Sequence, residues 1–158
     1  MILHLLRHAH AGDSTTWPGP DAERPLTKKG RDQATRLGRF LATNGIRPDA
    51  IMSSPKVRAQ QTAEIVATAL DLTVRLDERL GDGYDLADLA RIVEDSRVAA
   101  PMLVGHDPDL SFALAGLCAA RGLTMRKGSL ATIELRGSFT PGSGILRWLV
   151  PPDLLAAG

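Results

Sequence analysis

The pair Arg7-His8 stands directly after the apolar run Ile2 to Leu6, where a strand would release it into a loop. A guanidinium group binds phosphoryl oxygens through two parallel hydrogen bonds. An unprotonated imidazole nitrogen is a nucleophile that can attack phosphorus. A second arginine, Arg58, and a second histidine, His106, each follow a further strand-like run. Because open α/β sheets hold their ligands at the carboxyl ends of the strands, this pattern predicts phosphoryl chemistry at one sheet edge.

Strand-like runs and helix-length segments alternate over the first two thirds of the chain. The five runs are Ile2 to Leu6, Ala50 to Ser53, Met102 to Gly105, Ala131 to Leu135 and Ile145 to Val150. Such alternation is typical of a mostly parallel sheet with helices on both faces. The last two runs are joined by a turn-rich loop without room for a helix, which favours antiparallel pairing there.

Two helices are expected to flank the second run. Thr27 is the predicted N-cap of a helix that ends near Asn44-Gly45. Ser54 is the predicted cap of the next helix, with Pro55 in its first turn. This places Arg58 in the first turn as well, close to the preceding strand.

Two more helices are expected around the third run, over Leu86 to Glu94 and Pro108 to about Ala119. Asp107 reads as a cap or first-turn acid of the second of these. His4 shares a strand face with Leu6 and is predicted to be a hydrogen-bonded core histidine.

Length and charge restrict the classes of protein to consider. The 158 residues are enough for one core and too few for two ordinary domains, so we expect a single domain over residues 1–158. The formal net charge of +1 provides no broad basic field for nucleic acid. We find neither a basic leader with a cleavage site nor an apolar stretch of about 18 residues, and therefore expect a cytoplasmic protein without membrane contacts, monomeric by default.

Four sequence blocks in this order resemble the histidine phosphatase superfamily, also called phosphoglycerate mutase-like. They are Leu6-Arg7-His8-Ala9-His10-Ala11, Arg24-Pro25-Leu26-Thr27-Lys28-Lys29-Gly30, Ser53 to Thr62, and Val104-Gly105-His106-Asp107-Pro108. The short length and the RPLT-x-x-G block look like the bacterial SixA-type phosphohistidine phosphatases. The resemblance runs from Met1 to about Val150. It implies a three-layer α/β/α sandwich, with a mostly parallel sheet and one antiparallel strand near the C-terminus.

The resemblance also implies roles for individual residues. His8 would be the nucleophile that becomes phosphorylated, Arg7 and Arg58 would bind the phosphoryl group, and His106 would complete the pocket. Phosphoryl transfer places negative charge on the equatorial oxygens, so fixed cationic donors are what the chemistry requires as well. For attack, the other ring nitrogen of His8 must donate to a fixed acceptor, for which a backbone carbonyl is expected. No metal or other cofactor is expected.

A proton for the leaving group would come from a carboxylate. Glu78 is the first candidate, because it resembles the Glu-Arg of related mutases, and Asp82 is the second. Both also read as plain solvated acids. Phosphohistidine has a good leaving group near neutral pH, so a dedicated acid would matter less for that substrate.

The residue His10 departs from the Gly-Glu or Gly-Asp that many relatives carry after the Arg-His pair. It is expected either to touch substrate or to fill the rim. His8-Ala9-His10 also resembles the metal-binding HxH of amidohydrolases, and His4 could join it at a metal. Those enzymes are barrels of about 250 residues, which 158 residues cannot close.

Several other polar segments have two possible roles. The irregular stretch Gly12 to Glu23 is either a functional loop or a surface excursion. The cations of two further segments are expected to be solvated: Lys28, Lys29 and Arg31 on a helix face, and Arg121, Arg126 and Lys127 after the last helix. Arg24 could approach the site.

Three functions follow from this sequence. The first is a metal-independent phosphatase acting through phosphohistidine on His8, with protein phosphohistidine as substrate because the connections are short and the pocket should be open. The second is a broad small-molecule phosphomonoesterase. The third is a non-catalytic phosphate-binding scaffold, which retention of the nucleophile argues against.

Overall fold

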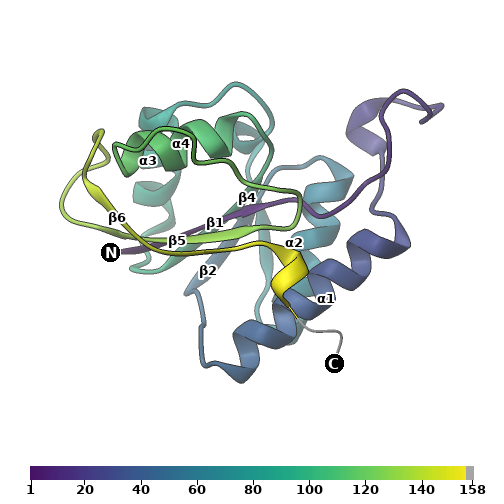
Figure 1. Cartoon of the computed structure of the whole chain (residues 1–158), viewed down its shortest axis with the longest axis horizontal. Coiled ribbons are helices and arrows are strands. Elements are labelled where there is room, and N and C mark those ends of the chain that lie inside the picture. The colour runs from purple at the N-terminus through teal and green to yellow at the C-terminus, as the bar shows by residue number, and fades with distance from the viewer. Residues whose placement is uncertain (156–158) are drawn as a thin grey trace.

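In the computed structural model, which describes residues 1–155, a six-stranded sheet lies between two layers of helices (Figure 1). The strand order is β3-β2-β4-β1-β5-β6. The strands are β1 (Ile2–Arg7), β2 (Ala50–Ser53), β3 (Val74–Leu76), β4 (Pro101–Gly105), β5 (Leu130–Leu135) and β6 (Gly144–Val150). The helices are α1 (Lys28–Thr43), α2 (Val57–Leu70), α3 (Leu86–Ser96) and α4 (Asp109–Leu117). Short 3-10 turns cover η1 (Asp21–Glu23), η2 (Glu78–Leu80) and η3 (Pro152–Leu154).

The first strand, β1, lies inside the sheet and determines how the site is built. It pairs in parallel with β4, with Arg7 opposite Gly105. On its other side it pairs antiparallel with β5. β5 is antiparallel also to β6, so β5 is the one strand that runs against the other five, as predicted.

Alternate side chains of β1 enter two different cores. Leu3 and Leu5 pack with residues of α3 and α4 on one face of the sheet. Leu6 packs with residues of α1 and α2 on the other face. Because successive strand residues point to opposite faces, one strand anchors both helical layers and holds its carboxyl end rigidly between them.

The predicted strands all form, each starting up to one residue earlier or ending up to one residue later than expected. The sequence reading omitted β3, a three-residue strand at the edge of the sheet with mostly exposed side chains. So short and exposed a segment has too little apolar alternation to stand out from a loop.

Two helices, α2 and α4, begin later than the sequence predicts. α2 begins at Val57, and Ser54 is not its cap. The Ser54 amide donates to the Val104 carbonyl at 2.9 Å, which keeps Ser54 attached to the sheet. α4 begins at Asp109 and ends at Leu117, within the predicted span.

Thr27 caps α1 as predicted, since its side chain accepts from the Gly30 amide and Asn44 ends the helix. α3 begins at Leu86 and continues two residues past the expected end. The segment between β1 and α1 extends away from the body of the molecule before it returns at η1 (Figure 1). Among the described residues, no helix is long and apolar enough to cross a membrane.

Candidate active site

The carboxyl ends of β1, β2 and β4 meet at one edge of the sheet and bring the predicted residues together. The His8 amide donates to the Gly105 carbonyl at 3.0 Å, so the chain after β1 stays beside the end of β4. The rings of His8 and His106 are 5.1 Å apart between centroids and tilted by 51°. The parallel pairing of β1 with β4 thus places a histidine from each strand end in one pocket.

The ring of His8 is buried and held in one tautomer. Its Nδ1 lies 2.8 Å from the Ala9 carbonyl oxygen, which can only accept, so Nδ1 carries the proton. Nε2 is therefore left with its lone pair. Desolvation by burial lowers the pKa of His8 to about 3, and the nearby His106 and Arg58 contribute to the lowering. His8 is neutral at physiological pH, as a nucleophilic imidazole must be.

The ring of His106 is held from the side of β2. Its Nε2 lies 2.8 Å from Ser54 Oγ, and Ser54 is completely buried. Its other nitrogen, Nδ1, is buried without a hydrogen-bond partner. Desolvation by burial lowers the pKa of His106 to about 3, with a further contribution from the positive charge of Arg58.

Arg7 is positioned by contacts on one side of its guanidinium. Nη1 donates to the Met125 carbonyl at 2.6 Å and to Asp107 Oδ2 at 3.2 Å. Asp107 Oδ2 also accepts from Ser111 Oγ at 2.8 Å. Asp107 is therefore an anchor of Arg7 and not the helix cap that the sequence predicted, because its carboxylate is turned toward the arginine.

Arg58 lies in the first turn of α2, as predicted, and is buried. Its Nη1 donates to the Asp21 carbonyl at 2.7 Å, and its Nη2 to Asp21 Oδ2 at 2.9 Å. The other carboxylate oxygen of Asp21 accepts from Arg24 Nε at 3.0 Å. The loop Gly12 to Glu23 thus contributes an anchor that links two arginines.

Three buried nitrogens of this site have no hydrogen-bond partner: Arg7 Nε, Arg58 Nε and His106 Nδ1. Leaving a buried donor unpaired costs about 1–3 kcal/mol, so such atoms are rare and mark places where a polar ligand can bind. The two arginine Nε atoms can only donate, so they fit an anion with several acceptor oxygens; His106 Nδ1 joins them as a donor in the tautomer in which Ser54 Oγ donates to Nε2.

The two predicted acids lie at different places. Glu78 is an exposed residue at the start of η2. Asp82 lies farther along the same loop, and both its oxygens are 2.6 Å from Lys56 Nζ. Neither appears among the hydrogen-bond or ion-pair partners of His8 or His106 in the described residues, and their role as leaving-group acids stays a prediction.

The ring of His10 lies at the rim. Its Nδ1 is 2.8 Å from Thr27 Oγ1, and it borders a pocket of about 310 Å³ together with Arg7 and Lys127. His4 is buried with Nδ1 2.8 Å from Thr132 Oγ1, which confirms the prediction of a core histidine. Within residues 1–155, no three His, Cys, Asp or Glu side chains lie close enough together to hold a metal ion. His4, His8 and His10 therefore do not form a three-ligand metal site in this structure.

The roles of four residues around the site were not predicted from the sequence. Ser54 and Asp107 carried a signal, but their types and positions are equally typical of helix caps. Asp21 lies 37 residues from Arg58, and nothing in its neighbourhood indicates the pairing. Lys127 was predicted to be plain solvated surface, whereas it borders the pocket beside Arg7 and His10.

Comparison with known proteins identifies the family. The family model described as histidine phosphatase superfamily (branch 1) matches residues 3–88, more than half of the chain. An uncharacterised protein of Picosynechococcus is 37% identical over 115 residues, which cover 70% of this chain and 68% of that protein.

Three matches cover almost the whole chain. The phosphohistidine phosphatase SixA of Escherichia coli is 25% identical over 158 residues, covering 96% of this chain and 94% of that protein. The structure of the protein histidine phosphatase SixA complexed with tungstate superimposes with a TM-score of 0.85 at 25% identity, covering 99% and 100% of the two chains. A putative SixA from Agrobacterium tumefaciens gives 0.79 at 25% identity, covering 96% and 97%.

The shared fold, the length of these matches and the site geometry all indicate the same family. In that geometry, two hydrogen-bonded histidines lie between two arginines. The chain belongs to the histidine phosphatase superfamily, is similar in fold and in extent to the SixA proteins named above, and is a phosphatase.

Proposed function

We propose that this phosphatase acts through a phosphohistidine intermediate on His8 and that its substrate is phosphohistidine on a protein. The observation that carries the mechanism is the hydrogen bond from His8 Nδ1 to the Ala9 carbonyl, at 2.8 Å. It presents Nε2 as a neutral nucleophile in a pocket lined with cationic donors. A module that only bound phosphate would have no need of this tautomer.

In the proposed first step, the Nε2 lone pair of His8 forms a bond to phosphorus while the bond from phosphorus to the leaving group breaks. Arg7, Arg58 and His106 Nδ1 donate to the equatorial oxygens, where charge accumulates. Water then attacks the phosphohistidine, releasing phosphate and restoring neutral His8. By analogy with removal of an oxyanion donor, loss of either arginine should slow turnover by about 10² to 10³.

A protein substrate is supported by similarity to SixA along the whole chain and by the surface pocket of about 310 Å³ that reaches Arg7 and His10. His10 and Lys127 border a pocket of about 450 Å³ at the surface, beside Gly12 and Arg24. In this proposal Glu78, or Asp82 in second place, supplies a proton only to leaving groups more basic than imidazole. His10 would touch the substrate at the rim.

The deciding experiment compares the wild-type protein with His8→Ala on two substrates, in the presence of chelator. The substrates are a chromogenic aryl phosphate and a protein phosphorylated on histidine. We expect chelator-resistant turnover of both that is lost in the variant, and a ³²P-labelled acid-labile enzyme adduct with the wild type alone.

The outcomes separate the candidate functions. A preference of at least tenfold in kcat/KM for the phosphohistidine protein supports the proposed substrate. The reverse preference supports a small-molecule phosphomonoesterase. Activity that chelator removes would contradict the metal-independent mechanism, and no turnover of either substrate would favour the scaffold.

A further inference from the structure

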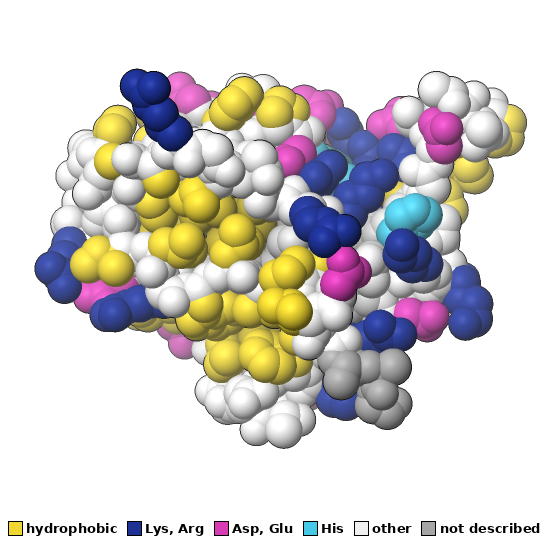
Figure 2. All heavy atoms as spheres, in the orientation of Figure 1, with side chains coloured by type: hydrophobic (Ala, Val, Ile, Leu, Met, Phe, Trp, Pro, Cys, Tyr) yellow, Lys and Arg dark blue, Asp and Glu magenta, His cyan; other side chains and the backbone are white. Residues whose placement is uncertain are grey.

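A groove lined with cations leads away from the active site between α1 and η3. We call it the basic groove and define it by Lys29, Gln33, Arg36, Arg126, Lys127 and Asp153, which line two adjoining pockets of about 370 and 310 Å³. Arg7 and His10 border the second pocket, so this pocket is continuous with the catalytic residues. Figure 2 shows lysine and arginine side chains gathered beside exposed histidine on this part of the surface.

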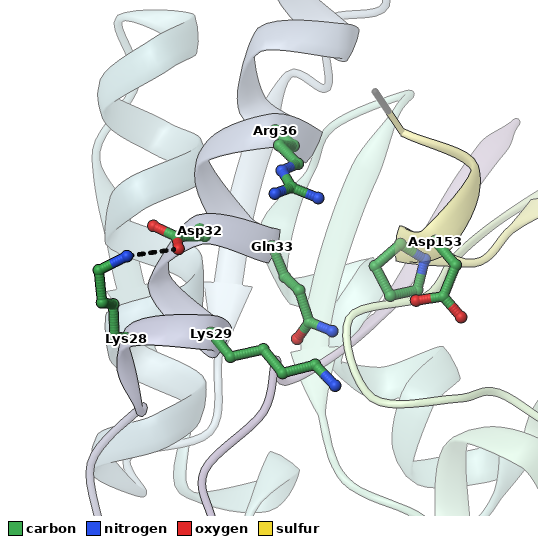
Figure 3. Close-up of a pocket in the computed structure, with 7 residues that line it drawn as sticks. Lys28, Lys29, Asp32, Gln33, Arg36 and Asp153 are labelled. Atoms are coloured by element: carbon green, nitrogen blue, oxygen red, sulfur yellow. Dashed lines mark hydrogen bonds and ion pairs between the residues drawn. The ribbon is translucent and has the colours of Figure 1, made fainter. Parts of the chain in front are cut away.

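The groove is built on one side of α1. Lys29, Gln33 and Arg36 are spaced by four and three residues, so they share a helix face. Figure 3 shows them directed toward the side where Asp153 lies. Lys28 and Asp32 also border the first pocket, where they form an ion pair with each other at 3.4 Å (Figure 3).

The groove is lined by more cationic side chains than acidic ones. Asp153 is paired with Arg126 at 2.8 Å. Lys29, Arg36 and Lys127 have no carboxylate within 4.0 Å among residues 1–155. In a chain with a formal net charge of only +1, such a local surplus of unpaired cations creates a potential that attracts anions.

Two further features favour an extended ligand. Gln33 Oε1 accepts from the His10 amide at 2.9 Å, so the side chain is held and its amide nitrogen can donate into the groove. Lys127 is half-buried, and desolvation together with the nearby Arg7 and Arg24 lowers its pKa, which places it beside the catalytic arginines. A bound carboxylate would relieve this repulsion.

The length of the groove fits an extended peptide better than a single phosphate group bound outside the catalytic pocket. Seven residues of α1 separate Lys29 from Arg36, which corresponds to about 10 Å along the helix axis. An extended peptide covers that distance with about three residues. A phosphate group would meet only one of these cations at a time.

We propose that the basic groove binds an acidic segment of the protein that carries the phosphorylated histidine, next to the histidine in sequence. This inference rests on the proposed function, because it assumes a protein substrate whose phosphoryl group lies at His8. Lys127 would contact the residue nearest the phosphohistidine, and Lys29 and Arg36 would contact carboxylates farther along.

The test measures kcat/KM on two phosphohistidine peptides of equal length. One has glutamates at the second to fourth positions on both sides of the phosphohistidine, and the other has glutamines there. An aryl phosphate, which ends at the catalytic pocket, serves as reference. At low salt we expect the wild type to favour the acidic peptide by about tenfold, equivalent to about 1.4 kcal/mol, and to lose most of this preference at 0.5 M salt.

The double variant K29A/R36A should lose most of that preference and hydrolyse the aryl phosphate as before. Arg39→Ala is the matched control, because it removes an exposed cation of the same helix that borders neither pocket, and it should retain the preference. In the charge-reversed variant K29E/R36E we expect a peptide with flanking lysines to become the better substrate.

Equal rates of the wild type on both peptides would overturn the inference while leaving the proposed function intact, provided that both are hydrolysed through His8. An equal loss of the preference in Arg39→Ala would also overturn it, because the net charge of the protein and not the groove would then determine the preference. A kcat/KM that is tenfold higher for a small aryl bisphosphate than for the aryl phosphate, with no preference for the acidic peptide, would assign the groove to a small molecule. Absence of turnover on any substrate would instead contradict the proposed function itself.

Discussion

Asp21 holds Arg58 by both its main chain and its side chain, with its carbonyl oxygen 2.7 Å from Nη1 and its Oδ2 2.9 Å from Nη2. The two residues come from a surface loop and a buried helix start. The Arg58 side chain is only 6% exposed, whereas that of Asp21 is 50% exposed. A solvent-accessible carboxylate thus orients a buried guanidinium whose Nε remains unpaired.

Asp21→Asn should lower kcat/KM for the aryl phosphate by about tenfold, because Arg58 and Arg24 lose the charged anchor they share and the guanidinium is less well aligned. Steady-state kinetics measure the effect. Glu23→Gln is the control, since Glu23 lies in the same turn without an ion pair in residues 1–155. An increase in kcat/KM would contradict this role and show that Asp21 competes with substrate for Arg58.

Ser54→Ala should lower kcat by about tenfold and the free energy of unfolding by about 1–3 kcal/mol, because the buried Nε2 of His106 loses its partner. Ser54→Thr retains a hydroxyl and should retain much of the activity. Ser53→Ala is a matched control, as Ser53 is equally buried but donates to the Ser54 carbonyl. Equal loss of kcat in both alanine variants would mean that packing, and not the hydrogen bond, is responsible.

Gly30→Ala should destabilise the protein by about 2 kcal/mol or more and reduce activity as well. A Cβ on Gly30 would lie 2.0 Å from the His10 carbonyl oxygen, so the backbone two residues after His8 has to move. Urea unfolding and kinetics together test this. Gly116→Ala is the control, because its Cβ would meet only a leucine methyl group at 3.4 Å, and it should be neutral or stabilising. A fully active and stable Gly30→Ala would contradict the packing of α1 against this loop.

Acid should destabilise the protein well before its carboxylates are protonated. Burial lowers the pKa of His4 to about 4 and of His8 and His106 to about 3, below the value of 6.5 for an unperturbed histidine. Between pH 6.5 and about 4 the unfolded chain binds more protons than the folded protein, so the free energy of unfolding falls as the pH falls. Each histidine contributes up to about 1.4 kcal/mol per pH unit.

Urea unfolding at pH 7, 6 and 5 measures this slope. His4→Gln removes one of the three buried histidines and should reduce the slope by less than one third, because the pKa of His10 at the rim is lowered as well. It should leave the activity in place, because His4 lies within β1 and bonds to Thr132. A free energy of unfolding that stays constant from pH 7 to 5 would show that the three rings are protonated as easily in the folded protein as in the unfolded chain.

The sequence by itself determined five of the six strands, the antiparallel pairing of the last two, and where Arg7, His8, Arg58 and His106 emerge from the sheet. Apolar runs and caps are local signals, and the carboxyl ends of parallel strands share one edge. The cap of α1 was also local, because the Thr27 side chain accepts from the Gly30 amide three residues away. The Asp85 cap of α3 has the same spacing but was not predicted.

Tertiary structure alone decided which partner each of these side chains finds. The contacts of Arg58 with Asp21 and of His106 with Ser54 join residues 37 and 52 positions apart. Ser54 and Asp107 were read as helix caps because serine and aspartate in those positions satisfy a helix end just as well in isolation. Lys127 and Lys29 looked like ordinary solvated cations for the same reason. Only the packing of α1, η3 and the end of β1 lines them up beside the catalytic residues, since a side chain's neighbours depend on the folded path and not on sequence distance.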